Sequence, residues 1–237
     1  ITEYLNLLHS LINKQIAELK VQDFEDHSEL NNYFELLPEN SILKSKFRGM
    51  QQLPQGYEKQ KHQNELKEHI VAGNIDVNIM SKVDKANYQN GIYLGDENTD
   101  ALAALRGFAK STLTSSVIVS AGLNQRLYAY METFSDFFPN AEGLFTKQII
   151  LKVSDYRSAM IQAKVLAKKG LWVSEFRIES GLNCGGHAFA TDGLLVGPIL
   201  QEFKENRTEL FAELFQIYLG VLKMKGLDQD ENWKPQQ

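Results

Sequence analysis

Residues 147–180 read KQIILKVSDYRSAMIQAKVLAKKGLWVSEFRIES, and this stretch decides the fold. It holds two short runs rich in β-branched and aromatic residues, Gln148–Ser154 and Ser174–Ser180, which predict strands. Between them, Ser158–Lys169 has the periodicity of a helix, and Gly170 follows it as a C-cap. A strand, a helix and a second strand in this order indicate parallel strands that are joined by a crossover helix.

The same alternation extends in both directions along the chain. Strand patterns occur at Asn74–Ser81 and Ser116–Gly122, and helical patterns at Asp100–Lys110 and Gln125–Phe138. Pro198 stands where a first helical residue is expected, and a long amphipathic helix or helix pair follows, with apolar positions at Ile199, Phe203, Leu210, Leu214, Tyr218 and Leu222. We therefore predict an α/β fold of parallel βα repeats at residues 71–226, followed by a polar tail at 227–237.

The first 70 residues differ in texture and predict a helical extension. Leu5, Leu8, Ile12, Ile16 and Leu19 recur at helical spacing and form one apolar stripe. The very polar stretch Gln51–His69 predicts a loop that leads to a solvated helix, and no strand pattern occurs before about residue 74.

Composition and charge exclude several classes of protein. The 237 residues are 43% hydrophobic and 23% charged, as in an ordinary globular protein, and no apolar stretch approaches the length of a membrane span. A net charge of −5 argues against a nucleic-acid partner. Cys184 is the only cysteine, so the chain has no internal disulfide or cysteine-rich metal site, and a reducing cytoplasmic location is expected. The first residues lack the pattern of a signal peptide. The chain begins at Ile1 rather than Met, which fits either a processed chain or one piece of a longer polypeptide.

One face of the predicted strands is polar. Glu175, Arg177 and Glu179 alternate with Phe176 and Ile178. The other strands show the same alternation, with Asp76, Asn78, Lys82, Ser116, Ser120, Gly122, Gln148, Lys152 and Ser154 on the polar side. A TIM-type barrel, here a partial one with four strands, accounts for this pattern because its apolar face packs on helices and its polar face lines the lumen. The alternative is an open sheet whose polar face is solvated.

A short internal echo also favours barrel-like repetition. Ser120-Ala121-Gly122-Leu123-Asn124 and Ser180-Gly181-Leu182-Asn183 each follow a predicted strand, two βα units apart. Reactive groups of α/β barrels lie at these carboxyl ends of the strands.

The loop after the fourth strand carries the residues with the most chemistry. Gly185 and Gly186 allow the backbone to approach a ligand closely, and His187 titrates near neutral pH. Cys184 and His187 could be metal ligands, or a nucleophile and its base in a hydrolase or lyase. We favour His187 as an acid, a base or a hydrogen-bonding group beside a bound cofactor or substrate. A glycine turn with a buried, backbone-bonded histidine is the structural alternative.

The sequence Cys184-Gly185-Gly186-His187 after a strand resembles the Gly-Gly-His motif of the nitronate monooxygenases, or 2-nitropropane dioxygenases, which are flavin-dependent TIM barrels. The preceding strand, its helix rich in Ala and Lys, and the Lys-Gly turn are also similar to that family. The resemblance implies that His187 is the catalytic base and that Gly185, Gly186 and Lys152 lie beside FMN. With it we take as candidate site residues Cys184, Glu179 and Arg177 for catalysis and Asn78, Ser120 and Asn124 for cofactor binding. The alternative role of Lys152 is that of a structural partner for Glu175 or Glu179.

The resemblance covers only the middle strands of such a barrel. The family's first two strands, and the last two that bind the flavin phosphate, have no counterpart in this chain. The leading expectation is a flavin-dependent oxidoreductase that acts on a small organic substrate. A second polypeptide, or the remainder of a longer chain, is an expected partner. The alternatives are a non-catalytic assembly subunit, which completes a barrel with another polypeptide through the long C-terminal helix, and a cysteine-dependent hydrolase or lyase.

Overall fold

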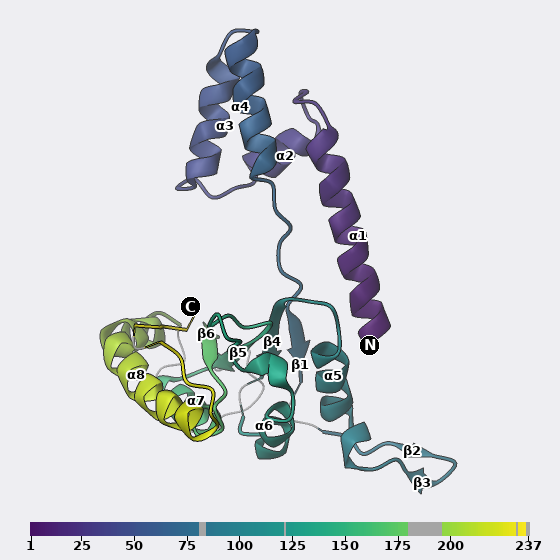
Figure 1. Ribbon diagram of the computed structural model, residues 1–237, viewed down its shortest axis with the longest axis vertical. Coiled ribbons are helices and arrows are strands. Elements are labelled where there is room, and N and C mark those ends of the chain that lie inside the picture. The colour runs from purple at the N-terminus through teal and green to yellow at the C-terminus, as the bar shows by residue number, and fades with distance from the viewer. Residues whose placement is uncertain (81–83, 121, 180–195, 231, 236–237) are drawn as a thin grey trace. The chain divides into compact units, whose positions relative to one another are not determined.

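The computed structural model describes residues 1–80, 84–120, 122–179, 196–230 and 232–235 (Figure 1). The chain divides into two compact units. One is helical and consists of Leu7–Gly73; the other is an α/β unit that consists of Ile1–Asn6 and Asn74–Gln237. Each unit is described by itself below.

The helical unit has its own small core. It contains most of α1 (Thr2–Val21), together with α2 (Glu29–Glu35), α3 (Ile42–Gln52) and α4 (Tyr57–Glu68). Ser28 and Ser41 cap α2 and α3, since each hydroxyl accepts a hydrogen bond from a backbone N–H in the first turn. Helix α4 occupies most of the stretch in which the sequence predicts a loop leading to a helix. The buried side chains are Leu19, Leu30, Phe34, Phe47, Met50, Leu66 and Ile70.

The α/β unit is built on four parallel strands. These are β1 (Val77–Ile79), β4 (Ser115–Val119), β5 (Lys147–Val153) and β6 (Val173–Ile178), which lie side by side in the order β1-β4-β5-β6 (Figure 1). The predicted α/β fold with parallel strands is therefore confirmed. Among the residues that the structure describes, the sheet keeps two free edges, at β1 and β6, and no closed barrel is present.

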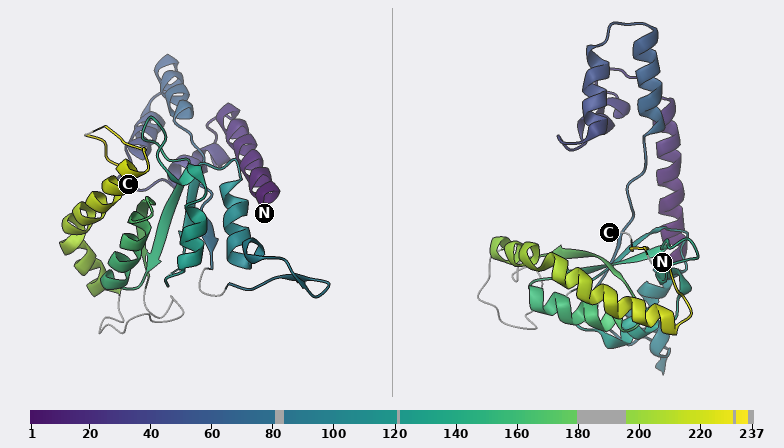
Figure 2. Two further views of the ribbon diagram at one scale, coloured as in Figure 1. Left: turned by 60° about the horizontal axis from the view of Figure 1, so that its bottom comes forward. Right: turned by 60° about the vertical axis from the view of Figure 1, so that its left-hand side comes forward.

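The helices of this unit cover one face of the sheet (Figure 2). They are α5 (Asp100–Ala109), α6 (Gln125–Met131), α7 (Tyr156–Ala167) and α8 (Val196–Met224), with short 3-10 helices η1 (Asp96–Asn98) and η2 (Ser135–Phe137). Each strand lies next to the following strand of the sheet, and crossovers between parallel strands are right-handed, so every connecting helix falls on the same side.

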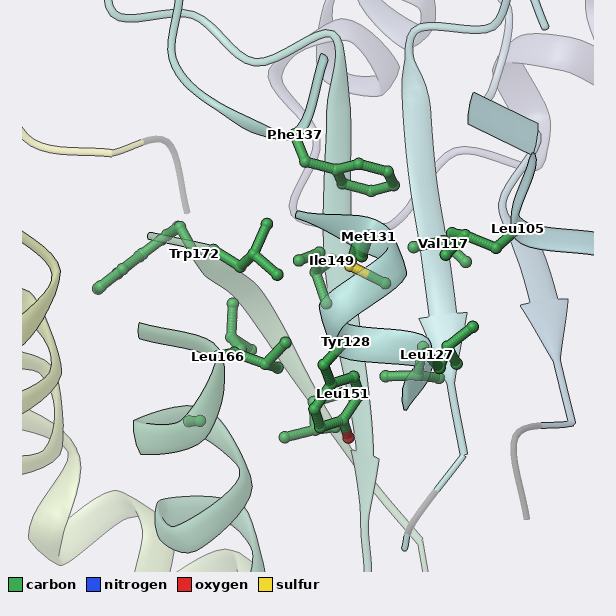
Figure 3. Close-up of a cluster of buried hydrophobic side chains, with 14 of the residues drawn as sticks. Leu105, Val117, Leu127, Tyr128, Met131, Phe137, Ile149, Leu151, Leu166 and Trp172 are labelled. Carbon is green, nitrogen blue, oxygen red and sulfur yellow. The ribbon is translucent and has the colours of Figure 1, made fainter. Parts of the chain in front are cut away.

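The core of the α/β unit lies between this sheet face and the helices. Val117, Ile149 and Leu151 of the strands are buried against side chains of the helices (Figure 3). The helices contribute Leu105, Leu127, Tyr128, Met131 and Leu166. Burial of each large apolar side chain stabilises the fold by roughly 1.5–3 kcal/mol. The apolar face of the sheet is therefore occupied by the core, and the opposite face remains for other functions.

The helix predicted over Gln125–Phe138 ends early, at Met131. The Thr133 hydroxyl donates a hydrogen bond of 2.7 Å to the carbonyl of Tyr130, which satisfies one of the last helical carbonyls. The 3-10 helix η2 then buries Phe137, whose exposed fraction is 1%.

A two-stranded hairpin, β2 (Tyr88–Gln89) and β3 (Ile92–Tyr93), follows β1 and was not predicted from the sequence. Its turn residues Asn90 and Gly91 both have positive φ, 51° and 79°, as a type I′ turn requires. The hairpin is largely exposed.

The C-terminal tail, predicted from the sequence to be polar, packs in part against the α/β core. The Trp233 indole N–H donates to the carbonyl of Gly143 at 3.1 Å. Its ring lies 6.2 Å from Phe145 and 6.3 Å from both Phe215 and Tyr218, measured between ring centroids. Of the described helices, none has the length and apolar character that crossing a membrane requires.

Candidate functional site

The sheet face away from the helices carries the predicted polar side chains. In the strand register, Asn78 lies beside Ile118, Ile118 beside Ile150, and Ile150 beside Glu175. Ile118 and Ile150 are only 6% and 2% exposed, so the centre of this face is apolar and its polar groups surround that centre.

An ion pair links the two edges of the sheet across this face. The Arg177 guanidinium lies 3.0 Å from a Glu175 carboxylate oxygen and 3.8 Å from a carboxylate oxygen of Asp76. Asp76 immediately precedes β1 and Arg177 is in β6, so the two residues come from opposite edges. Three strand spacings of about 4.8 Å separate the two backbones by roughly 14 Å in a flat sheet, a distance that the long Arg177 side chain and the Asp76 carboxylate span together. We call this polar side the concave face (Asp76, Asn78, Ser116, Ile118, Gln148, Ile150, Lys152, Glu175, Arg177 and Glu179), because the helix-covered face of an α/β barrel is its outer face.

Asp76 is fixed by the neighbouring strand. The backbone N–H of Ser116 donates to one carboxylate oxygen of Asp76 at 3.3 Å, and the Ser116 hydroxyl lies 3.5 Å from the side-chain oxygen of Gln148. Asp76, Ser116 and Gln148 are thus in contact across the amino-terminal part of the concave face. The second carboxylate oxygen of Asp76 is the one that lies near Arg177.

A lysine and a glutamate pair at the opposite, carboxyl-terminal end of the strands. The Lys152 ammonium of β5 lies 3.1 Å from a carboxylate oxygen of Glu179, and the two side chains are 19% and 25% exposed. Glu179 follows β6, and its N–H donates to the carbonyl of Val153, which holds its backbone beside β5. Because both groups are largely shielded from water, their attraction is screened less than that of a surface pair. Parallel α/β sheets bind ligands at this end of the strands.

The remaining predicted site residues are placed as follows. Asn78 is exposed on β1, and Ser120 directly follows β4 and is partly buried. The Asn124 side chain accepts a hydrogen bond of 2.9 Å from the N–H of Leu127 and so caps α6, a role that needs no cofactor. The predicted loop residues Cys184, Gly185, Gly186 and His187 lie outside the described residues.

The apolar stripe of α8 serves mainly the internal core. Leu210, Leu214 and Tyr218 are 5%, 4% and 0% exposed and belong to the core cluster, whereas Phe203 is only partly buried. Within the part of the chain that the structure describes, no three His, Cys, Asp or Glu side chains are grouped so that they could hold a metal ion.

A groove between β6 and α8 was not predicted from the sequence. Its volume is about 410 Å³, and we call it the β6 groove. Trp172, Phe176 and Ile178 line it on the strand side, and Leu200, Phe203, Phe211 and Leu214 on the helix side. Lys204 and Arg207 of α8 complete the lining with two cations. The available sequence signal was the apolar first half of α8, with Leu200, Phe203 and Phe211. The amphipathic pattern alone did not distinguish side chains that line a groove from side chains of the core.

Comparison with known proteins found no relative of this chain: no family model matches it, and neither a curated protein nor a solved structure is significantly similar.

Proposed function

We propose that this chain is a flavin-dependent oxidoreductase of TIM-barrel type, similar to the nitronate monooxygenases, and that it acts on a small organic substrate at the concave face. The observation that carries the proposal is the Lys152–Glu179 pair, which lies at the carboxyl ends of the neighbouring parallel strands β5 and β6 with its charges largely shielded. Sequential parallel strands, helices on one face and a polar face on the other are the features of barrel enzymes that support this choice.

The concave face fits the ring end of a flavin better than its phosphate. When FMN is bound, its ring accepts and returns electrons, and a nearby cation stabilises the negative charge of the reduced ring. Lys152 supplies that cation, and Glu179 holds its ammonium in place. Arg177, the other cation among the described residues of the concave face, is engaged by Glu175 and Asp76. The flavin phosphate would therefore need binding groups from outside the concave face. The resemblance assigns cofactor contacts to Gly185 and Gly186 and the role of base to His187.

The proposal is tested by titration of the purified chain with FMN, followed by visible absorbance and equilibrium dialysis. We expect saturable binding with a perturbed flavin spectrum. Lys152→Met removes the cation, so it should weaken binding by about tenfold, the equivalent of about 1.4 kcal/mol, and lower the midpoint potential of bound FMN.

Lys152→Arg is the matched control, because it keeps the charge and should retain most of the binding and the potential. Absence of FMN binding by the wild-type chain would refute the proposal. So would a Lys152→Met protein whose bound FMN has the affinity and potential of the wild type.

A further inference from the structure

Among the described strands, β6 has a neighbour on one side only, and its other edge has backbone groups directed outward. The N–H of Glu179 donates to the carbonyl of Val153 at 2.9 Å, so the alternate residues Arg177 and Glu175 direct their backbone groups to β5. Phe176 and Ile178 lie between them and direct their N–H and C=O groups to the other side. Among the residues that the structure describes, β6 pairs with β5 alone. An edge of this kind is a template for a further strand.

The position of α8 shows where that strand would lie. Helix α7 packs against both strands that it connects, β5 and β6. Helix α8 packs against α7 and against one strand of the sheet, β6. Where a second strand would lie under α8, the structure has the β6 groove. Leu200 at this groove is 49% exposed, and Phe176 and Phe203 are only partly buried. A strand added to β6 with apolar side chains on its helix-facing side would cover these residues.

The opposite edge of the same sheet has the required character. Strand β1 pairs with β4 alone among the described strands, and it is parallel to β6 within the sheet. Ile75, Val77 and Ile79 face the helix side, and Asp76 and Asn78 face the concave side. A strand that pairs with β6 needs the same pattern, with apolar side chains on the helix side and polar side chains on the concave side.

We propose that two copies of this chain close into one eight-stranded parallel barrel, in which β6 of each copy pairs with β1 of the other. Four sequential parallel strands with every connecting helix on one face are half of such a barrel, and the Arg177–Asp76 pair shows that side chains from the two edges reach each other across the polar face. A twofold axis along the barrel removes both open edges at once, whereas a single added strand would leave β1 open. The concave faces of the two copies then form one lumen, so the candidate site around Lys152 and Glu179 is complete only in the dimer.

The oligomeric state of the purified full chain, measured by size-exclusion chromatography with light scattering, tests this inference. We expect twice the mass of the single chain. Leu200→Glu places a charge in the β6 groove, and Ile178→Pro removes an outward-directed N–H without removing a bond to β5. Each should raise the dimer dissociation constant by about tenfold or more.

Met224→Glu is the control, since Met224 is another exposed apolar residue of α8, 79% exposed and away from the groove. It should leave the dimer intact, and circular dichroism should show all three variants folded. A monomeric wild type overturns the inference. It is also overturned by a dimer that Leu200→Glu and Ile178→Pro leave unchanged, because its interface would then lie elsewhere. FMN binding by a monomer would separate this failure from a failure of the proposed function.

Discussion

Lys147 is a charged side chain in the core, at the start of β5. It is 0% exposed, and its ammonium donates hydrogen bonds to the carbonyls of Ser111 and Leu113 and to the Ser111 hydroxyl. The ammonium also lies 4.7 Å from the centre of the Phe108 ring. Burial lowers the pKa of Lys147 to about 8, and the charge of Asp136 opposes this shift only in part. The lysine therefore ties the connection between α5 and β4 to β5.

This lowered pKa predicts a pH-dependent stability. Below pH 8 the folded and unfolded chains both carry the Lys147 proton, so the cost of burying the charge is fully present. Between about pH 8 and 10.5 the folded chain releases this proton while the unfolded chain still holds it, so the contribution of Lys147 to stability rises with pH. We expect the free energy of unfolding of the wild type to rise relative to Lys147→Met by about 1–3 kcal/mol from pH 7 to pH 10, measured by urea denaturation.

Lys168→Met, a change at an exposed lysine of the same unit, should show no such difference from the wild type. Parallel pH profiles for wild type and Lys147→Met would contradict the assignment of the lowered pKa to Lys147.

At the residue scale, strand alternation predicted side-chain direction well, and it also predicted that Lys152 pairs with Glu175 or Glu179, which the Lys152–Glu179 contact confirms. It placed Lys152, Arg177 and Glu179 on the polar face, where the structure has them, because the two-residue period of a strand fixes direction. It could not predict that Arg177 reaches Asp76, since that contact depends on the order of the strands and joins residues about a hundred positions apart. The loop Cys184 to His187, which the sequence favours most strongly, stays a prediction.

At the scale of elements, the strands were predictable and the short hairpin was overlooked. The four strands of the sheet have short runs rich in β-branched or aromatic residues, and their predicted and observed bounds differ by a few residues at most. Strands β2 and β3 have only two residues each, too few for a periodic pattern. The Asn90-Gly91 pair was the available signal, because both residues tolerate the positive φ of a type I′ turn.

Gly143 provides a test of how the tail is attached to the α/β unit. Its φ is 75°, and a Cβ at this position would collide with the indole ring of Trp233. Gly143→Ala should therefore lower the free energy of unfolding by about 2–4 kcal/mol, from backbone strain and from displacement of the indole. Thermal denaturation followed by circular dichroism measures the loss.

Gly91→Ala is the matched variant, because Gly91 also has a positive φ, 79°, but no atom lies within 4 Å of an added Cβ. Its cost should be backbone strain alone, about 1–2 kcal/mol. Equal losses in the two variants would show that the contact between Trp233 and Gly143 adds nothing to stability.

At the scale of the whole molecule, the chain has two cores that share one helix. The first residues of α1 belong to the α/β unit, where the Thr2 hydroxyl donates to the carbonyl of Gly107 and Asn6 accepts from the N–H of Thr112. The rest of α1 belongs to the helical unit. The change in sequence texture near residue 70 indicated two regions. The sequence could not show that one helix belongs to both, because its apolar stripe is continuous.

Two exposed helical glycines allow the units to be stabilised one at a time. Gly49 of α3 and Gly220 of α8 have no atom within 4 Å of an added Cβ, so alanine at either position should stabilise its unit by about 0.5–1 kcal/mol. In calorimetry we expect Gly49→Ala to raise the midpoint of one transition and Gly220→Ala that of the other. A single transition that both variants shift equally would mean that the shared helix makes the two units unfold together.

The aromatic cluster around Tyr218 has a practical consequence for such measurements. Trp172 and Trp233 are the only tryptophans of the chain, and both lie against Tyr218 in the α/β unit. Tryptophan emission therefore reports on the α/β unit alone, and melting of the helical unit by itself would leave the emission spectrum unchanged while far-ultraviolet ellipticity falls. A difference between the two optical signals would then identify which unit has unfolded and would not by itself indicate a partly folded state of either unit.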